Sequence, residues 1–109
     1  LNYYLITVRG EKRVNLKDFR RQHGTRPLTF ASEEELPELL GLTPGAVTPL
    51  GLLHDTACRV RFYLDQDFLE EPGIIGIHPN DNTATVWLKT RELAELIRRH
   101  GTPTEIVPF

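Results

Sequence analysis

The chain has 109 residues, of which 39% are hydrophobic and 26% are charged, and its formal net charge is −2. This length predicts one domain over residues 1–109, and the composition excludes an intrinsically disordered chain. Without a long apolar run or a recognisable leader over Leu1–Gly10, we expect no membrane partner and a cytoplasmic location. The single cysteine, Cys58, excludes an internal disulfide and argues against a zinc site.

The N-terminal part predicts a strand, a helix and a short second strand. Asn2–Arg9 is rich in tyrosine and β-branched residues, which favour extended backbone. Asn15 is a good N-cap for a helix over residues 16–23, and Gly24 is placed to end it. A short strand is expected at Leu28–Phe30.

A second helix is predicted before Gly41. Ser32 and Glu35 have the spacing of a capping box, and the leucines at 36, 39 and 40 form an apolar stripe. Pro37 conflicts with a helix that starts at Ser32. It can instead be the first helical residue, with a looser entry before it.

The passage over residues 42–53 is apolar but punctuated by glycine and proline. Such a segment is either a rigid buried connection or the wall of a pocket that presents main-chain groups to a small ligand. His54 and Asp55, which follow, resemble a catalytic pair, but adjacent residues on a strand point to opposite faces. We therefore interpret them as part of a turn.

A hairpin over Gly73–Lys89 is the most organised part of the chain. Both of its arms are β-branched, and residues 79–82 are strong turn formers. His78 precedes the turn, where the sheet would hold the imidazole within reach of a ligand. The alternative is that His78 only pairs with a loop carbonyl.

Around this hairpin the pattern predicts three more elements and a helical turn at Gln66–Leu69. Arg59–Asp65 alternates apolar and polar residues as a half-buried strand does. Thr90 is expected to cap a helix over residues 91–100, and Thr104–Val107 is expected to be the last strand. Runs of strands mixed with single helices predict an α/β (α+β) fold in which a mixed β-sheet is packed with helices, not a doubly wound parallel sheet.

Two motifs carry a resemblance to a known family. Gly45-Ala-Val-Thr-Pro49 fits a G-x-x-x-P loop, and His78-Pro-x-x-Asn-Thr-Ala-Thr85 fits a histidine hairpin. Together, and in this order, they resemble the YbaK/prolyl-tRNA synthetase-associated domain family, most closely its PrdX-like free-standing branch. The resemblance implies a YbaK-like editing domain that acts as a trans-editing aminoacyl-tRNA deacylase. Such a hydrolase cleaves mischarged Ala-tRNA(Pro) and thereby maintains the fidelity of translation.

The resemblance also assigns the site residues. It implies that Gly45 holds the aminoacyl carbonyl through main-chain contacts and that His78 orients the substrate or the water. The implied substrate-binding residues are Val47, Thr48, Pro49, Asn82 and Thr83. The implied mechanism is substrate-assisted ester hydrolysis, in which a ribose hydroxyl of the terminal adenosine helps to activate water, with no cofactor and no metal.

One feature departs from the family. Its members carry a lysine upstream of the strand that matches Asn2–Arg9, and Lys12, Lys17 and Lys89 do not match that motif. We therefore expect a domain that lacks its N-terminal part, and keep as the alternative a non-catalytic pseudo-editing module that binds tRNA or a synthetase.

The partners implied are the acceptor end of mischarged tRNA and prolyl-tRNA synthetase. Because the overall charge is weakly acidic, a tRNA would need a local basic patch. The candidates are Arg59 and Arg61 on one strand face, or Arg91, Arg98 and Arg99 on the last helix, and a solvated face explains either group equally well.

Overall fold

The computed structural model describes residues 3–10, 12–30, 32, 34–41, 48–77 and 85–109. Within these ranges the helices are α1 (Leu16–His23), α2 (Glu35–Leu40) and α3 (Thr90–His100), and the 3₁₀ helices are η1 (Pro49–Leu53) and η2 (Gln66–Leu69). The strands are β1 (Tyr3–Thr7), β2 (Val60–Asp65), β3 (Ile74–Ile77), β4 (Val86–Lys89) and β5 (Thr104–Val107).

The described strands form two separate sheets. β1, β2 and β5 make a parallel sheet with β2 in the centre, with Tyr3 opposite Val60 and Phe62 opposite Thr104. β3 and β4 pair antiparallel, with Ile74 opposite Lys89. The predicted α+β class with helices packed on sheets is thus confirmed, but the parallel and antiparallel strands do not share one mixed sheet.

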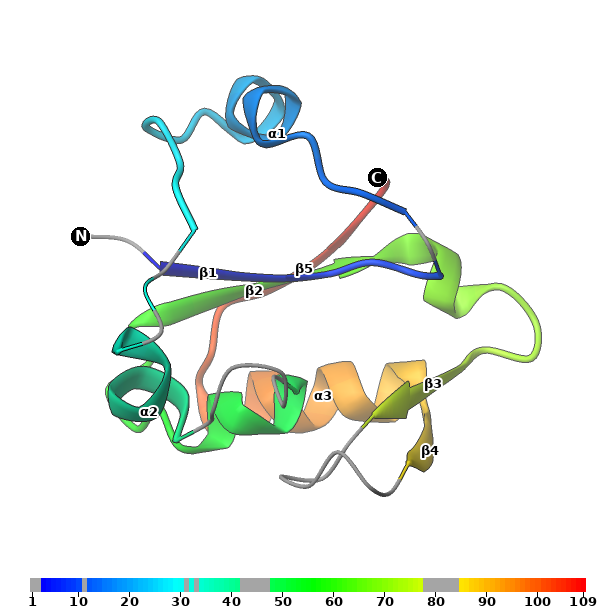
Figure 1. Cartoon of the computed structure of the whole chain (residues 1–109). Helices are drawn as coiled ribbons and strands as arrows, with labels where there is room; N and C mark the ends of the chain where they lie inside the picture. Colours follow the sequence, from blue (N-terminus) through cyan, green and yellow to red (C-terminus); the bar gives the residue numbers. More distant parts are fainter. Residues whose placement is uncertain (1–2, 11, 31, 33, 42–47, 78–84) are drawn as a thin grey trace.

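The three-stranded sheet lies between two layers of helices. α1 lies on one side of it, and α2 and α3 lie on the opposite side, where the β3–β4 pair also packs (Figure 1). The main core fills the space on the α3 side. Its fully buried members include Leu52, Phe62, Leu64, Leu93 and Ile97.

A smaller aromatic cluster holds α1 on the sheet. Phe19 is buried, and its ring centroid lies 4.9 Å from that of Tyr63, in an edge-to-face arrangement. Tyr4 and His23 complete the cluster. Burial in this cluster raises the pKa of the Tyr63 phenol, and the nearby carboxylate of Glu105 adds to the effect.

The predicted ends of α1 and the predicted turn at Gln66–Leu69 are confirmed. Asn15 Oδ1 accepts hydrogen bonds from the backbone N–H groups of Lys17 and Asp18, at 3.0 and 3.2 Å. Gly24 adopts the left-handed conformation, with φ of 65°, that ends α1. The predicted turn at Gln66–Leu69 is the 3₁₀ helix η2.

Three local predictions were wrong. Leu28–Phe30 forms no strand, because nothing in the described chain pairs with it, and Phe30 is 88% exposed. α2 begins at Glu35, whose carboxylate accepts from the Ser32 hydroxyl at 3.2 Å, so Ser32 is not the N-cap. Thr90 is the first residue of α3, and its hydroxyl donates to the Phe68 carbonyl at 2.7 Å instead of capping the helix.

Pro37 is the third residue of α2. The first N–H groups of a helix have no intrahelical partner, so proline is tolerated there and the conflict disappears. Among the residues that the structure describes, no helix is long and apolar enough to cross a membrane.

Candidate functional site

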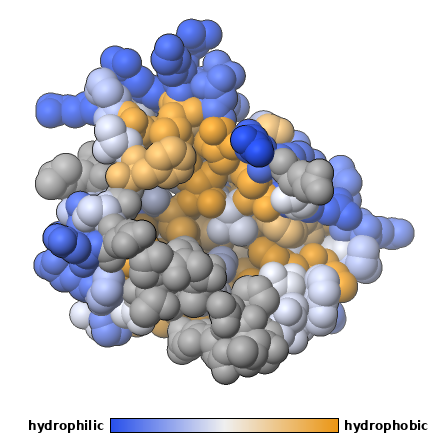
Figure 2. All heavy atoms as spheres, viewed as in Figure 1, coloured by the Kyte–Doolittle hydropathy of each residue, from blue (hydrophilic) through white to orange (hydrophobic). Residues whose placement is uncertain are grey.

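A cavity of about 910 Å³ opens between β1 and the β3–β4 pair. Hydrophobic residues gather around a hollow in the face of the molecule shown in Figure 2. The cavity is lined by Leu5, Ile6, Thr7, Val8, Arg9, Gly10, Thr48, Pro49, Phe68, Pro72, Ile74, Ile75, Gly76, Ile77, Thr85 and Trp87. The size and the mostly apolar lining are typical of a small-ligand site.

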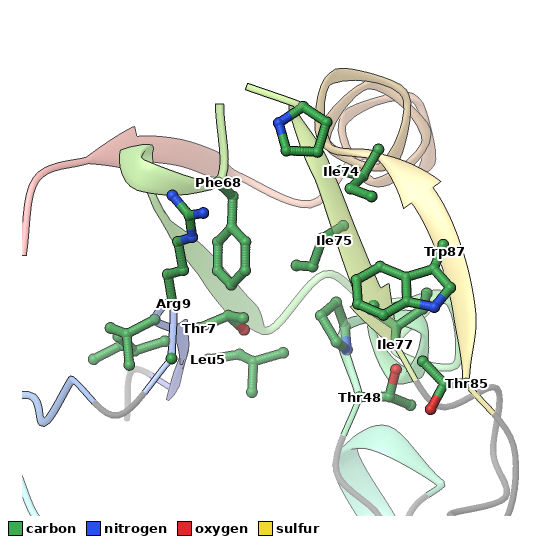
Figure 3. A pocket seen from close by; sticks show the side chains of 16 residues that line it. Leu5, Thr7, Arg9, Thr48, Phe68, Ile74, Ile75, Ile77, Thr85 and Trp87 are labelled. Atoms are coloured by element: carbon green, nitrogen blue, oxygen red, sulfur yellow. The ribbon is translucent and has the colours of Figure 1, made fainter. Parts of the chain in front are cut away.

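The two sides of the cavity come from distant parts of the sequence. Leu5, Thr7 and Arg9 of the β1 segment lie on one side, with Phe68 (Figure 3). Ile74, Ile75 and Ile77 of β3 lie on the other side. Because Ile75 and Ile77 are also members of the main core, that side is fixed by the packing of the whole domain.

The end of the G-x-x-x-P segment forms a further part of the wall. Thr48 is buried and extended, with φ of −142°, and its hydroxyl accepts from the Leu50 N–H at 3.4 Å. Pro49 begins η1, where the lack of an N–H has no cost. Leu52, three residues on, is fully buried and anchors the segment in the core. Residues 48–53 thus combine a rigid buried connection with a cavity wall.

Across the β3–β4 pair, Gly76 stands directly opposite Trp87. A Cβ atom on Gly76 would lie 3.0 Å from Cη2 and Cζ3 of the indole and 3.2 Å from Cγ2 of Thr85. The glycine therefore lets the Trp87 ring lie close over the strand backbone. The ring remains 65% exposed, although it lines the cavity.

A buried carboxylate organises the polar end of the cavity. Asp65, at the end of β2, accepts hydrogen bonds from the N–H groups of Arg9 at 3.0 Å and Asp67 at 3.1 Å. Lys12 Nζ lies 3.0 Å from Asp65 Oδ2 and also pairs with the Asp67 carboxylate. Burial opposes ionisation of Asp65, but the two N–H groups and the ammonium outweigh it and lower the pKa.

The same network holds Arg9 at the rim. Its Nη1 donates to the Asp67 carbonyl at 3.0 Å and to Glu70 Oε2 at 3.1 Å. The Asp67 and Asp65 carboxylates in turn raise the pKa of Lys12. Local sequence patterns could not predict the contacts of Arg9 and Lys12 with these carboxylates, since the partners lie more than 50 residues apart.

Two of the predicted site residues, Thr48 and Pro49, lie in the cavity wall. Gly45, Val47, His78, Asn82 and Thr83 lie outside the described residues, and so does the predicted turn at 79–82. The roles assigned to all seven residues remain predictions.

Several other residues singled out in the sequence have structural partners. The buried Asp55 accepts from the Val60 N–H at 2.8 Å, which supports its assignment to a turn. The Arg59 guanidinium lies over the Tyr3 ring, and Arg99 pairs with Glu95 on α3. In the described part of the chain no three His, Cys, Asp or Glu side chains are grouped so that they could hold a metal ion.

The model of the aminoacyl-tRNA editing domain matches residues 1–96, and the chain belongs to this family. The YbaK/PrdX-like resemblance is thereby confirmed.

Individual relatives give the same result. The chain is 34% identical over 99 residues to the prolyl-tRNA editing protein ProX of Acetoanaerobium sticklandii, covering 91% of this chain and 60% of that protein. It is 34% identical over 111 residues to prolyl-tRNA synthetase associated domain-containing protein 1 of Mus musculus, covering 99% of this chain and 65% of that protein. The chain thus spans about three fifths to two thirds of the length of these relatives.

A solved structure supports the fold. It was determined in work on epitope backbone grafting by computational design for the presentation of linear epitopes on scaffold proteins. It superposes with a TM-score of 0.71 at 27% identity, covering 97% of this chain and 65% of that one.

Proposed function

We propose that this chain forms the substrate-binding part of a trans-editing deacylase that hydrolyses Ala-tRNA(Pro). The observation that carries the proposal is the cavity itself. Its walls include the described ends of both motifs, Thr48 and Pro49 from the glycine loop and Ile77 and Thr85 from the histidine hairpin. Membership of the aminoacyl-tRNA editing family and the similarity to ProX support the same reaction class.

Amino acid size explains why such an enzyme is needed. A synthetase pocket built for proline excludes the smaller alanine poorly, because a missing methylene is worth only about 1–3 kcal/mol. A second site that admits alanine and rejects proline supplies the missing discrimination. In our proposal Val47 and Pro49 form the limiting wall of that sieve, and Gly45 leaves room for the ester to approach the main chain.

The described lining favours a mechanism in which the substrate supplies a reacting group. Among the described lining residues none is a histidine, aspartate or glutamate, so these walls offer no ordinary general base. In the proposed step a water oxygen attacks the ester carbonyl carbon while a ribose hydroxyl of the terminal adenosine helps to remove its proton. The carbon–oxygen bond to the ribose then breaks, and the proton passes to the ribose oxygen.

Four residues outside the described ranges, Gly45, His78, Asn82 and Thr83, complete the proposed site. His78 directly follows Ile77, which lines the cavity, and we assign it the orientation of the substrate or the water. Asn82 and Thr83 belong to the same hairpin motif and are assigned to substrate binding. The main-chain N–H groups near Gly45 would stabilise the negative charge that develops on the carbonyl oxygen.

The test is single-turnover deacylation of Ala-tRNA(Pro), with Pro-tRNA(Pro) as the control substrate. The proteins compared are the 109-residue chain, a version extended upstream to include the family lysine, and His78→Ala in each. We expect hydrolysis of the alanyl ester only, and a loss of rate in His78→Ala. If both proteins bind the tRNA but leave the ester intact, the chain is a binding module and not a deacylase. If they neither bind the tRNA nor cleave the ester, the proposal is wrong.

A further inference from the structure

Trp87 is the chain's only tryptophan, and it is the most exposed aromatic residue of the cavity lining. A large apolar ring that is 65% exposed loses most of the free energy that its burial would give. The strand opposite leaves room for it, because a Cβ atom at Gly76 would lie only 3.0 Å from the ring. The exposed indole thus lies close to the backbone of the neighbouring strand.

The surroundings of Trp87 are suited to a flat, mostly apolar ligand group. Ile74, which is partly exposed, lies on the same face of the β3–β4 pair as Gly76 and Trp87. Thr85 adds a hydroxyl beside the ring, and Leu5 lies on the opposite side of the cavity (Figure 3). Lys89, two residues after Trp87 on β4, places a cation on the same strand face.

The opposite, polar end of the cavity is not suited to an anion. There the cations Arg9 and Lys12 are already engaged by the three carboxylates of Asp65, Asp67 and Glu70. A phosphate is therefore disfavoured at that end. The Trp87 end offers a π-face, and Lys89 follows on the same strand face. An aromatic face with a nearby cation is the usual composition of a site for an unpaired nucleotide.

We propose that the indole of Trp87 is the stacking platform for the unpaired terminal adenine of the tRNA acceptor strand, with Lys89 facing the backbone phosphate. The inference rests on the proposed function for the choice of ligand. Stacking on the rim fixes the terminal ribose, so the aminoacyl ester attached to it enters the cavity toward Pro49 and Ile77. Trp87 is thus a positioning residue for the reaction.

Tryptophan fluorescence gives the direct test. The trinucleotide CCA is titrated into the full chain and compared with a CC dinucleotide that carries an abasic 3′ position. We expect CCA to quench the emission and the abasic probe to leave it unchanged. Subtracting the signal of Trp87→Phe isolates the contribution of this residue.

Kinetics give the second readout. Trp87→Ala is expected to weaken CCA binding and raise the KM for Ala-tRNA(Pro) about 5- to 150-fold, the range equivalent to one lost base–aromatic stack. Trp87→Phe retains a π-face and is expected to recover most of the loss. Phe30→Ala is the matched control, since it removes an aromatic ring that is even more exposed but does not line the cavity.

The outcomes separate the inference from the proposed function. If the chain hydrolyses Ala-tRNA(Pro) but CCA causes no quenching and Trp87→Ala keeps the wild-type KM, Trp87 is not a stacking platform. The proposed deacylase function is then retained. If CCA quenches and the ester is not cleaved, the nucleotide site stands without the activity. If Trp87→Ala instead dissociates a dimer, measured by light scattering, and leaves CCA binding unchanged, the surface is an interface between two copies and the inference is overturned.

Discussion

Asp65→Asn tests whether one buried carboxylate links the carboxyl ends of β1 and β2 beside the cavity. The Asp65 side chain is fully buried, and it accepts from two backbone N–H groups and pairs with Lys12. Removing one partner of a buried ion pair costs about 3–5 kcal/mol. Asparagine keeps one acceptor oxygen and Lys12 keeps Asp67, so we expect a loss of about 2–4 kcal/mol in the free energy of unfolding.

The pH dependence provides an independent check on the same residue. The pKa of Asp65 is lowered in the folded state, so its stabilising effect is complete above the unfolded pKa of about 3.9 and is lost as the pH falls through the folded pKa. The wild-type chain should therefore lose more unfolding free energy below about pH 4 than Asp65→Asn does.

Urea unfolding from pH 7 to pH 2, followed by circular dichroism, measures both effects. The matched control is Asp18→Asn, which neutralises an exposed carboxylate on α1 and should change the stability by no more than about 0.5 kcal/mol. Two results would refute the assignment of a buried, ionised carboxylate. One is a loss in unfolding free energy below about 1 kcal/mol for Asp65→Asn, and the other is a fall in stability below pH 4 identical to that of the wild-type chain.

Three further substitutions probe the elements that shape the cavity. Thr90→Val removes the hydroxyl that donates to the Phe68 carbonyl and should cost about 1–3 kcal/mol, while Thr90→Ser should cost clearly less, as measured by urea unfolding. Gly76→Ala places a methyl group 3.0 Å from the exposed Trp87 ring, which can swing outward. We expect a shifted maximum of tryptophan emission and weaker CCA binding, with a loss in unfolding free energy below about 1 kcal/mol. Phe62→Ala opens the centre of the core and should cost about 3–5 kcal/mol by thermal unfolding, and a smaller loss would contradict its complete burial.

The sequence predicted the elements whose causes are local. Asn15 and Gly24 mark the ends of α1 because each satisfies backbone groups of its own helix. The alternation over Arg59–Asp65 predicted the strand β2 and its core residues Val60, Phe62 and Leu64. It did not predict that Tyr63 and Asp65 on the other face are buried as well, because that face is covered by distant parts of the chain. Leu28–Phe30 has the same β-propensity but no partner strand among the described residues, and propensity alone does not make a strand.

The features that depend on distant partners could not be predicted. Asp65 and Lys12 are 53 positions apart, and only the parallel pairing of β1 with β2 brings them together. The division of the strands into two sheets is likewise a result of tertiary packing. Of the candidate site, the described ends of the two motif segments, Thr48 and Thr85, lie in the cavity wall, and no local signal pointed to Trp87 as part of the lining.

The most direct test of the account is the ratio of single-turnover hydrolysis rates for Ala-tRNA(Pro) and Pro-tRNA(Pro), measured on the chain and on its upstream-extended version. The account predicts that the alanyl ester is cleaved much faster than the prolyl ester and that His78→Ala lowers the rate for the alanyl ester. Equal rates for the two esters, or no cleavage of either by both proteins, would contradict the central claim that this cavity edits misacylated tRNA(Pro).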